Sequence, residues 1–324
     1  MIKEAASPLE PRFEDLAGDG LGQRLRRLAL ATRPKFLTAS VLPVLAGTAW
    51  GAAVAGRLQF VTAAFAVLAT ALVHAASNVL NDVGDELTGG DRANDERIYP
   101  YTGGSRFIQN GIMTVQEMNR WGLSLLAASA VFGVALTLMK GPLVMIFGLA
   151  GVAIAVLYSL PSVQLSGRGV GEAFIAIAFG LLPVCGAAWL QSGIIDWASV
   201  LVAVPVGLWV TLILLINEVP DRKADAVSGK RTLVVRLGTS GAQWLYRGIH
   251  LGAFACVATL AVRGLMPWWV GVGGAAILLG GLKAAGGIGD PTSGRAALTR
   301  SIEMTLGLQA TGTVLLIVGA IFAG

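Results

Sequence analysis

The chain has 324 residues, of which 55% are hydrophobic and only 13% are charged. Soluble domains carry about 25% charged residues, so this composition excludes an ordinary soluble globule, a disordered chain and a coiled coil. The formal net charge of +5 does not indicate a nucleic-acid partner, because the basic residues sit in short loops between apolar runs, as membrane topology requires.

The first 35 residues are a segment of their own, because no apolar run precedes Phe36. Charges are scattered through them, which excludes a signal peptide. Arginines interleave with leucines from Arg24 to Arg33, a pattern that predicts a basic amphipathic helix on the membrane surface. A solvated tail is the alternative that this composition leaves open.

Nine apolar runs follow, each close to the 20 residues that cross about 30 Å of hydrocarbon as a helix. In lipid every backbone group must be satisfied internally, and runs of this length favour helices over barrel strands. We therefore predict an all-α integral membrane protein, a bundle of nine transmembrane helices around a central cavity that occupies residues 36–324. The predicted spans are 36–56, 60–81, 120–139, 142–160, 170–191, 197–218, 241–262, 267–284 and 303–323.

The lysines and arginines predict the orientation of this bundle. With the N-terminus inside, the inner segments hold 20 of the 24 basic residues and the outer connections hold Arg57, Lys140 and Arg263. Positive charge concentrates on the cytoplasmic side of membrane proteins. We expect a cell-membrane protein, the inner membrane in a bacterium, with its N-terminus in the cytoplasm and its C-terminus on the other side.

Acidic residues gather at the inner ends of the second and the sixth predicted spans. The first cluster begins at Asn81-Asp82 and continues through Asp85 to Asp91. If the helix continues inward, Asp82 and Asp85 are three residues apart and share a face. Two carboxylates that close repel each other unless a cation lies between them.

The second cluster begins at Asn217 and places Asp221 and Asp225 at successive four-residue steps, with Pro220 expected to bend the helix. Four spans separate the two clusters, so both lie on one side of the membrane. Each acidic cluster follows the second span of a set of four, which suggests two related four-helix halves with a ninth helix appended. Sites often form where such halves meet.

Hard oxygen ligands of this kind suit Mg²⁺, which combines one or two carboxylates with phosphate oxygens of a substrate. Two such clusters that face each other would hold a diphosphate between metal ions. Basic residues nearby could bind the remaining phosphate charge; they are Arg106, Arg222, Lys223, Lys230 and Arg231. The acids Glu86, Asp95 and Glu96 are interpreted as solvated loop residues.

These two motifs resemble those of the UbiA-type superfamily of intramembrane prenyltransferases. The first motif of that family matches at Asn81, Asp82, Asp85, Gly89 and Asp91, and the second at Asp221 and Asp225. The resemblance covers the chain from about residue 30 and implies nine helices with two aspartate-rich cytoplasmic loops.

Within that family the chain is most similar to the 1,4-dihydroxy-2-naphthoate polyprenyltransferases of menaquinone synthesis. The segments that carry this similarity are 103–106, 168–172 and 229–233. Pro220 departs from that branch, which has arginine at this position. Other acceptors therefore stay open: 4-hydroxybenzoate, homogentisate, a chlorophyllide or an ether-lipid precursor.

The resemblance implies transfer of a polyprenyl group from its diphosphate to an aromatic ring, with Mg²⁺ as the cofactor and the lipid bilayer as the setting. Metal ions would be held by Asp82, Asp85, Asp91, Asp221 and Asp225. Contacts to the diphosphate are expected from Asn81, Asn217, Arg106, Arg222 and Lys230. The metal charge would stabilise the departing pyrophosphate mainly in the transition state.

Three further polar residues have two interpretations each. Tyr158 either stabilises a carbocation or positions the acceptor, or it is an interfacial anchor. His74 is a buried partner for another helix, with acceptor binding or proton removal as the alternative. Glu172 lies at a membrane boundary, where a functional role is a fair default, although it could cap a helix or pair with Arg168.

The rival from another class is a secondary transporter. Transporters usually place their charged site near the bilayer midplane, whereas the acids here gather at one end of the spans. This placement favours chemistry at the membrane surface on an amphiphilic substrate.

Overall fold

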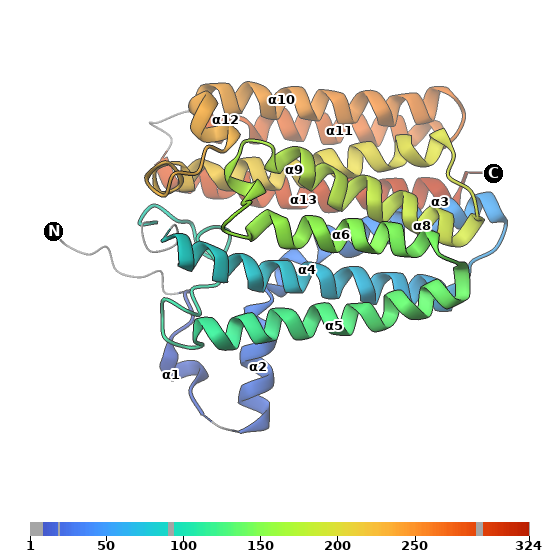
Figure 1. Cartoon of the computed structure of the whole chain (residues 1–324). Helices are drawn as coiled ribbons and strands as arrows, with labels where there is room; N and C mark the ends of the chain where they lie inside the picture. Colours follow the sequence, from blue (N-terminus) through green and yellow to red (C-terminus); the bar gives the residue numbers. More distant parts are fainter. Residues whose placement is uncertain (1–8, 19, 90–93, 290–293, 324) are drawn as a thin grey trace.

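The computed structural model describes residues 9–18, 20–89, 94–289 and 294–323, and these residues form helices and loops without any strand. Long helices lie side by side along one common axis, whereas α2 stands across that axis at one end of the bundle (Figure 1). The helices are α1 (Phe13–Leu16), α2 (Leu21–Ala31), η1 (Pro34–Phe36), α3 (Thr38–Ala55), α4 (Phe60–Thr88), α5 (Val115–Lys140), α6 (Leu143–Ser159), η2 (Leu165–Gly167), α7 (Gly171–Ala176), η3 (Ile177–Leu181), α8 (Leu182–Ser192), α9 (Trp197–Val227), α10 (Leu233–Val262), α11 (Trp268–Ala284), α12 (Gly286–Gly289) and α13 (Gly294–Ile321).

The prediction of an all-helical membrane protein is confirmed. In the described part of the chain, eight helices are long and apolar enough to cross a membrane, and α6 is a shorter apolar helix of 17 residues. The fifth predicted span is built from three consecutive pieces, α7, the π-helical η3 and α8. Helices of this kind satisfy their own backbone hydrogen bonds, which lipid cannot do.

Five helices extend beyond the predicted spans at the end of the bundle where the acids lie. α4 continues to Thr88 and α9 to Val227, while α5 and α13 begin at Val115 and Gly294. α10 begins at Leu233, although its backbone is not helical at Gly238, close to the predicted start of that span. The predictions ended at the first charged residues, but a helix needs only its backbone hydrogen bonds and a capped end. The hydroxyl of Thr232 supplies such a cap by accepting a hydrogen bond from the Val235 amide.

The largest buried cluster joins α9 to α10, α11 and α13, and α9 is the most deeply buried of the long helices. α3 packs closely on α8 because two glycines face it. A methyl group on Gly47 or Gly51 would lie only 2.1 Å from the Val184 carbonyl oxygen or 2.3 Å from that of Ala188. Small residues allow this approach in membrane bundles.

A second buried cluster joins α4, α5 and the segment that follows α4, and it includes Leu16 and Ala31 from the N-terminal helices. The carboxyl ends of α4 and α9 meet at the same end of the bundle, near α1, and α13 ends at the opposite end (Figure 1). The two acidic motifs therefore lie at one end of the molecule, as their spacing predicts.

Candidate active site

The polar end of α4 carries the first motif. Asn81 and Asp85 are four residues apart, so they project in nearly the same direction, and both line a cavity at this end of the bundle. Asp82 is only 2% exposed and is not among the lining residues. A step of three residues leaves the two side chains about 60° apart around the helix, and Asp82 is directed to Arg33 and the Ser105 amide beside the cavity.

The polar end of α9 carries the second motif and faces the first across this cavity. Asn217, Asp221 and Asp225 all line it. The helix continues through Pro220 without interruption, so the four-residue spacing holds them on one face. The side chain of Asn94 donates a hydrogen bond of 2.7 Å to Asp221, which ties the loop after the first motif to the second motif.

The polar cavity between the two motifs has a volume of about 170 Å³. Four carboxyl groups and two cationic side chains line it, together with amide, hydroxyl and glycine groups. The lining residues are Arg33, Asn81, Asp85, Asn94, Tyr101, Thr102, Gly103, Gly104, Tyr158, Ser166, Leu214, Asn217, Glu218, Asp221, Ala224, Asp225, Lys230 and Thr232.

Lys230 connects the two motifs directly. Its Nζ atom lies 2.6 Å from Asp85 Oδ1 and 3.5 Å from Asp225 Oδ1. These two carboxylate oxygens, from helices far apart in the sequence, are therefore no more than about 6 Å apart. The backbone holds the lysine there, because its amide donates a 2.9 Å hydrogen bond to the Asp225 carbonyl.

Arg33 is a residue of the site that the sequence pattern did not identify. It belongs to the N-terminal segment, lines the polar cavity and forms an ion pair with Asp82. The other carboxylate oxygen of Asp82 accepts a 3.1 Å hydrogen bond from the Ser105 amide. Asp82 thus holds a cation and a loop in position beside the cavity.

Glu218 is the second residue that the pattern did not single out. It lines the cavity, is only 7% exposed, and its Oε2 atom has no hydrogen-bond partner. Its carboxyl group lies near that of Glu172, and Glu172 accepts a 3.2 Å hydrogen bond from the Leu233 amide. Glu172 therefore lies beside another acid and contacts the start of α10, whereas Arg168, the alternative partner, donates hydrogen bonds to the carbonyls of Ser162 and Val163.

The loop after α4 forms one wall of the cavity. Gly103 and Gly104 have φ angles of +77° and +76°, a region that favours glycine and lets the bare backbone border the cavity. Tyr101 donates a 3.0 Å hydrogen bond to Glu303. Burial first and the Glu303 carboxylate second raise the pKa of the Tyr101 phenol, so it remains a neutral donor.

Some predicted residues lie elsewhere. Arg106 and Arg222 are not among the residues that line the cavity, although Arg106 directly follows the loop that contacts Asp82. Asp91 lies outside the described residues. The interpretation of Glu86 as a solvated acid is wrong, because this side chain is buried and accepts a 3.1 Å hydrogen bond from Gln109. Asp95 and Glu96 are exposed, as expected.

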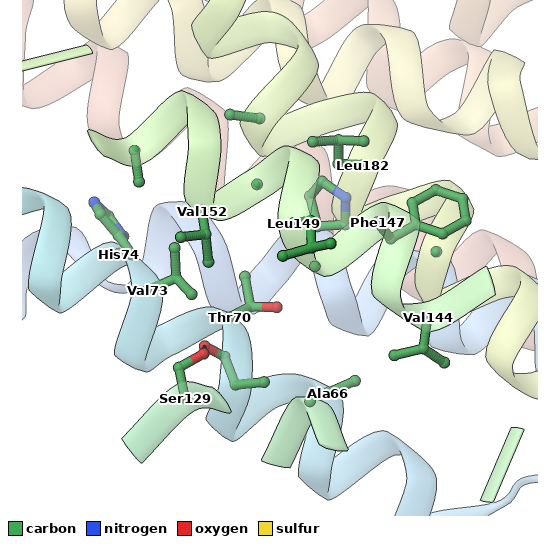
Figure 2. A pocket seen from close by; sticks show the side chains of 18 of the residues that line it. Ala66, Thr70, Val73, His74, Ser129, Val144, Phe147, Leu149, Val152 and Leu182 are labelled. Atoms are coloured by element: carbon green, nitrogen blue, oxygen red, sulfur yellow. Dashed lines mark hydrogen bonds between the residues drawn. The ribbon is translucent and has the colours of Figure 1, made fainter. Parts of the chain in front are cut away.

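A larger, apolar cavity of about 530 Å³ lies deeper in the bundle, between α3, α4, α5, α6, η3 and α8. Figure 2 shows Thr70 and Val73 of α4, Leu149 and Val152 of α6, and Leu182 of α8 around it. On α5 its lining extends from Leu126 to Leu138, which is about 18 Å of helix. The cavity is therefore elongated along the bundle axis.

This apolar cavity is open at the side of the bundle. Leu138 of α5 is 84% exposed, and Val134, Met145 and Leu149, which also line the cavity, are exposed as well. In a membrane these side chains meet lipid, so a long apolar molecule could leave the cavity between α5 and α6.

Tyr158 lines both cavities and therefore lies where the polar one meets the apolar one. His74 lines the apolar cavity (Figure 2). Its Nδ1 atom is 3.0 Å from the Ser40 hydroxyl of α3, and its ring packs edge-on against Phe179. This is the polar contact with another helix that the sequence predicts for a buried histidine.

The oxygen donors that the structure describes at the site are of the type that binds a hard divalent cation, although they are not close enough together to coordinate one in this arrangement. In the described part of the chain, no group of three or more His, Cys, Asp or Glu side chains is close enough to hold a metal ion. However, Asp85, Asp221 and Asp225 line one cavity, and the buried Oδ1 atom of Asn217 has no partner. Carboxylate and amide oxygens are the donors that Mg²⁺ prefers.

Comparison with known proteins gives a consistent picture. The sequence model of the UbiA prenyltransferase family matches residues 40–308. The chain is 31% identical over 245 residues to a 1,4-dihydroxy-2-naphthoate octaprenyltransferase of Escherichia coli (strain K12), covering 73% of this chain and 77% of that protein. It is also 31% identical over 292 residues to the protein of the same name from Mycobacterium tuberculosis, covering 90% and 94%.

The fold is shared with solved structures. A UbiA homolog from Archaeoglobus fulgidus, bound to DMAPP and Mg²⁺, aligns with a TM-score of 0.64 at 17% identity and covers 89% of this chain and 98% of that one. A digeranylgeranylglyceryl phosphate synthase aligns with a TM-score of 0.60, also at 17% identity, over 92% of this chain and 99% of that one.

Proposed function

Because the chain belongs to the UbiA prenyltransferase family and is an integral membrane prenyltransferase, we propose that it transfers a polyprenyl group from a polyprenyl diphosphate to 1,4-dihydroxy-2-naphthoate. The observation that supports this most is the meeting of a small polar cavity with a long apolar one at Tyr158. A prenyl diphosphate has the same division into an anionic head and an apolar tail. The acceptor is inferred from relatives of that name, which are 31% identical.

The polar cavity would bind the diphosphate. Lys230 and Arg33 supply positive charge to its oxygens, and Asn81 and Asn217 offer amide groups beside them. Mg²⁺ would be held by carboxylates of the two motifs, with Asp85, Asp221 and Asp225 in the cavity and Asp82 beside it. The metal ion would supply charge that stabilises the leaving diphosphate.

The bond that breaks is the allylic C–O bond, whose electron pair leaves with the diphosphate. A ring carbon of the acceptor then supplies the electron pair of the new C–C bond, and that carbon releases its own substituent, a proton or the carboxylate as CO₂, whose bonding electrons restore the aromatic ring. Tyr158 lies at the junction where the cationic carbon would form, and the face of an aromatic ring attracts a cation. The apolar cavity excludes water, which would otherwise capture that carbon as an alcohol.

The tail of the donor would occupy the apolar cavity and continue into lipid. Because the cavity opens between α5 and α6 at exposed residues such as Leu138, its volume does not limit the length of the chain. His74 lies in the wall of the same cavity and is placed to contact an acceptor ring as well as Ser40.

We also propose that the polar cavity opens toward the cytoplasm. Both motifs lie at the end of the bundle near α1 (Figure 1). The loops that are rich in lysine and arginine, which we expect to be cytoplasmic, lie at the same end. A soluble aromatic acceptor could enter the cavity from the cytoplasm, and the diphosphate could be released to that side.

The test is prenyl transfer by the purified protein in lipid nanodiscs. A labelled polyprenyl diphosphate is offered with 1,4-dihydroxy-2-naphthoate, 4-hydroxybenzoate or homogentisate, and products are identified by mass. We expect product with the naphthoate, dependent on Mg²⁺. Asp85→Asn should abolish it, whereas Glu96→Gln, which changes an exposed acid of the neighbouring loop, should not.

Each contrary result has a distinct meaning. Product with another acceptor alone would reject the naphthoate assignment and keep the reaction class. Equal activity in Asp85→Asn and the wild type would reject the proposed site.

A further inference from the structure

The helix α2 carries a row of three leucines, two of which are exposed. Leu21, Leu25 and Leu28 are four and three residues apart and lie on one face. Leu28 packs against the buried cluster of α4 and α5, whereas Leu21 is 74% exposed and Leu25 is 57% exposed. The helix is short, so few of its own contacts hold it folded in this position.

Arginines flank this row on the same helix. Arg24, Arg26 and Arg27 lie within α2, which contains no acidic residue. The acids of the preceding helix, Glu14 and Asp15, are exposed, and Glu117 of α5 lies near Arg27. A basic helix with a leucine face of this kind lies in the plane of a membrane interface.

The placement of α2 in the fold agrees with that orientation. Its axis runs across the axis of the long helices, at the end of the bundle where α4 and α9 end (Figure 1). The indole of Trp121, near the start of α5, donates a 3.0 Å hydrogen bond to the Leu28 carbonyl. Tryptophan is enriched at membrane interfaces, so α2 is fixed at the level where the apolar part of α5 begins.

We propose that α2 is a binding surface for anionic phospholipids, with its leucines in the acyl boundary and its arginines against the phosphate headgroups. Charge complementarity favours this occupant over a protein partner, because the helix carries arginines and no acid. A face of two exposed leucines is also far smaller than the roughly 800 Å² per partner of a standard protein interface.

This lipid contact would reach the candidate active site through the backbone. α2 ends two residues before Arg33, which pairs with Asp82. The carbonyl of the intervening Thr32 accepts a 2.9 Å hydrogen bond from Asn78 of α4. Docking of α2 would therefore hold the arginine at the polar cavity.

The test measures the depth of α2 directly. In a background of Cys185→Ala and Cys256→Ala, a nitroxide label is placed at Leu25→Cys on the leucine face or at Gln23→Cys on the opposite face. Power saturation with oxygen and with a water-soluble nickel chelate is measured on the full chain in nanodiscs of phosphatidylcholine, with or without phosphatidylglycerol.

We expect the label at position 25 to be shielded from nickel only when phosphatidylglycerol is present, and the label at position 23 to be accessible in both lipids. Arg24→Gln with Arg26→Gln should remove the shielding, because each arginine near an anionic surface changes the docking equilibrium about fivefold. Arg57→Gln with Arg263→Gln removes the same charge from exposed positions at the other end of the bundle and should have no effect.

Two results would overturn the proposal. Nickel access at position 25 that is equal in both lipids would show a solvated helix. Shielding that persists in detergent or in pure phosphatidylcholine would show that protein, either this chain or a second copy, covers the leucines. Because the readout does not involve prenyl transfer, it stands apart from the proposed function, and unchanged thermal unfolding of each variant in detergent verifies its fold.

Discussion

Lys230 offers the most direct test of how the two acidic motifs are held together. Its ammonium group lies between Asp85 and Asp225, and all three side chains are at most 17% exposed. Lys230→Met keeps the apolar stem and removes the charge, so both carboxylates lose their partner. Breaking a buried ion pair by removing one side costs about 3–5 kcal/mol.

Because these side chains retain some exposure, we expect a loss of about 2–4 kcal/mol in the absence of metal ions. For a protein of 324 residues, that corresponds to a fall in unfolding temperature of about 3–6 °C. The matched control is Lys223→Met, whose partner is Glu96. Both of those side chains are more than half exposed, and such surface pairs contribute about 0–1 kcal/mol.

The assay is thermal unfolding in detergent with a thiol-reactive dye, since Cys185 is buried and Cys256 is partly buried. It is run in EDTA and again in millimolar MgCl₂. We expect Mg²⁺ to raise the unfolding temperature of Lys230→Met more than that of the wild type, because the lysine no longer competes for the same carboxylates. Equal shifts for both methionine variants, or a Mg²⁺ effect that is smaller in Lys230→Met, would refute this reasoning.

Three further predictions concern catalysis, the tail cavity and topology. Asp221→Asn should lower the rate of prenyl transfer roughly 10²–10³-fold without changing the unfolding temperature, and a rate near that of the wild type would exclude this carboxylate from the mechanism. Gly151 lines the apolar cavity with no atom near its added Cβ, so Gly151→Leu should slow transfer from long donors more than from a five-carbon donor. Gly248→Leu, at an equally open glycine outside the cavity, is its control, and equal slowing with both donors would contradict the proposed tail site. In cells, a membrane-impermeant maleimide should label Ile194→Cys and spare Val227→Cys, because the exposed Ile194 lies in the loop before α9 and the exposed Val227 is the last residue of that helix; the reverse pattern would invert the proposed orientation.

The sequence predicts the helices and the two motifs well because both depend on local properties. Hydropathy identifies each apolar run, and the four-residue spacing of Asn217, Asp221 and Asp225 holds them on one face of α9, where all three line the cavity. The sequence predicts the ends of the helices less well than their apolar parts. The polar ends of α4 and α9 are still helical, since α4 reaches Thr88 and α9 reaches Val227, and hydropathy carries no information about a helix beyond the lipid.

The residues that the sequence pattern missed depend on contacts between distant segments. Arg33 precedes the first span and has no acidic neighbour in sequence, yet it meets Asp82 in the fold. Glu218 follows Asn217 at the end of an apolar run, and Glu172, the acid near it, belongs to another helix. An acid at the end of an apolar span is a sign of function, but only the packed structure shows that these two acids meet.

The charges of the polar cavity bear on the proposed binding of a diphosphate with a divalent cation. Among the described residues that line it, four carboxyl groups face two cationic side chains. A diphosphate alone would add negative charge to a region that already has too little positive charge, and burial makes such an imbalance costly. A divalent cation that enters with the diphosphate offsets both the excess carboxylates and part of the ligand charge. In the proposed function the cavity would therefore bind a diphosphate together with a divalent cation and not alone, and the cation would stabilise the pyrophosphate that leaves when the C–O bond breaks.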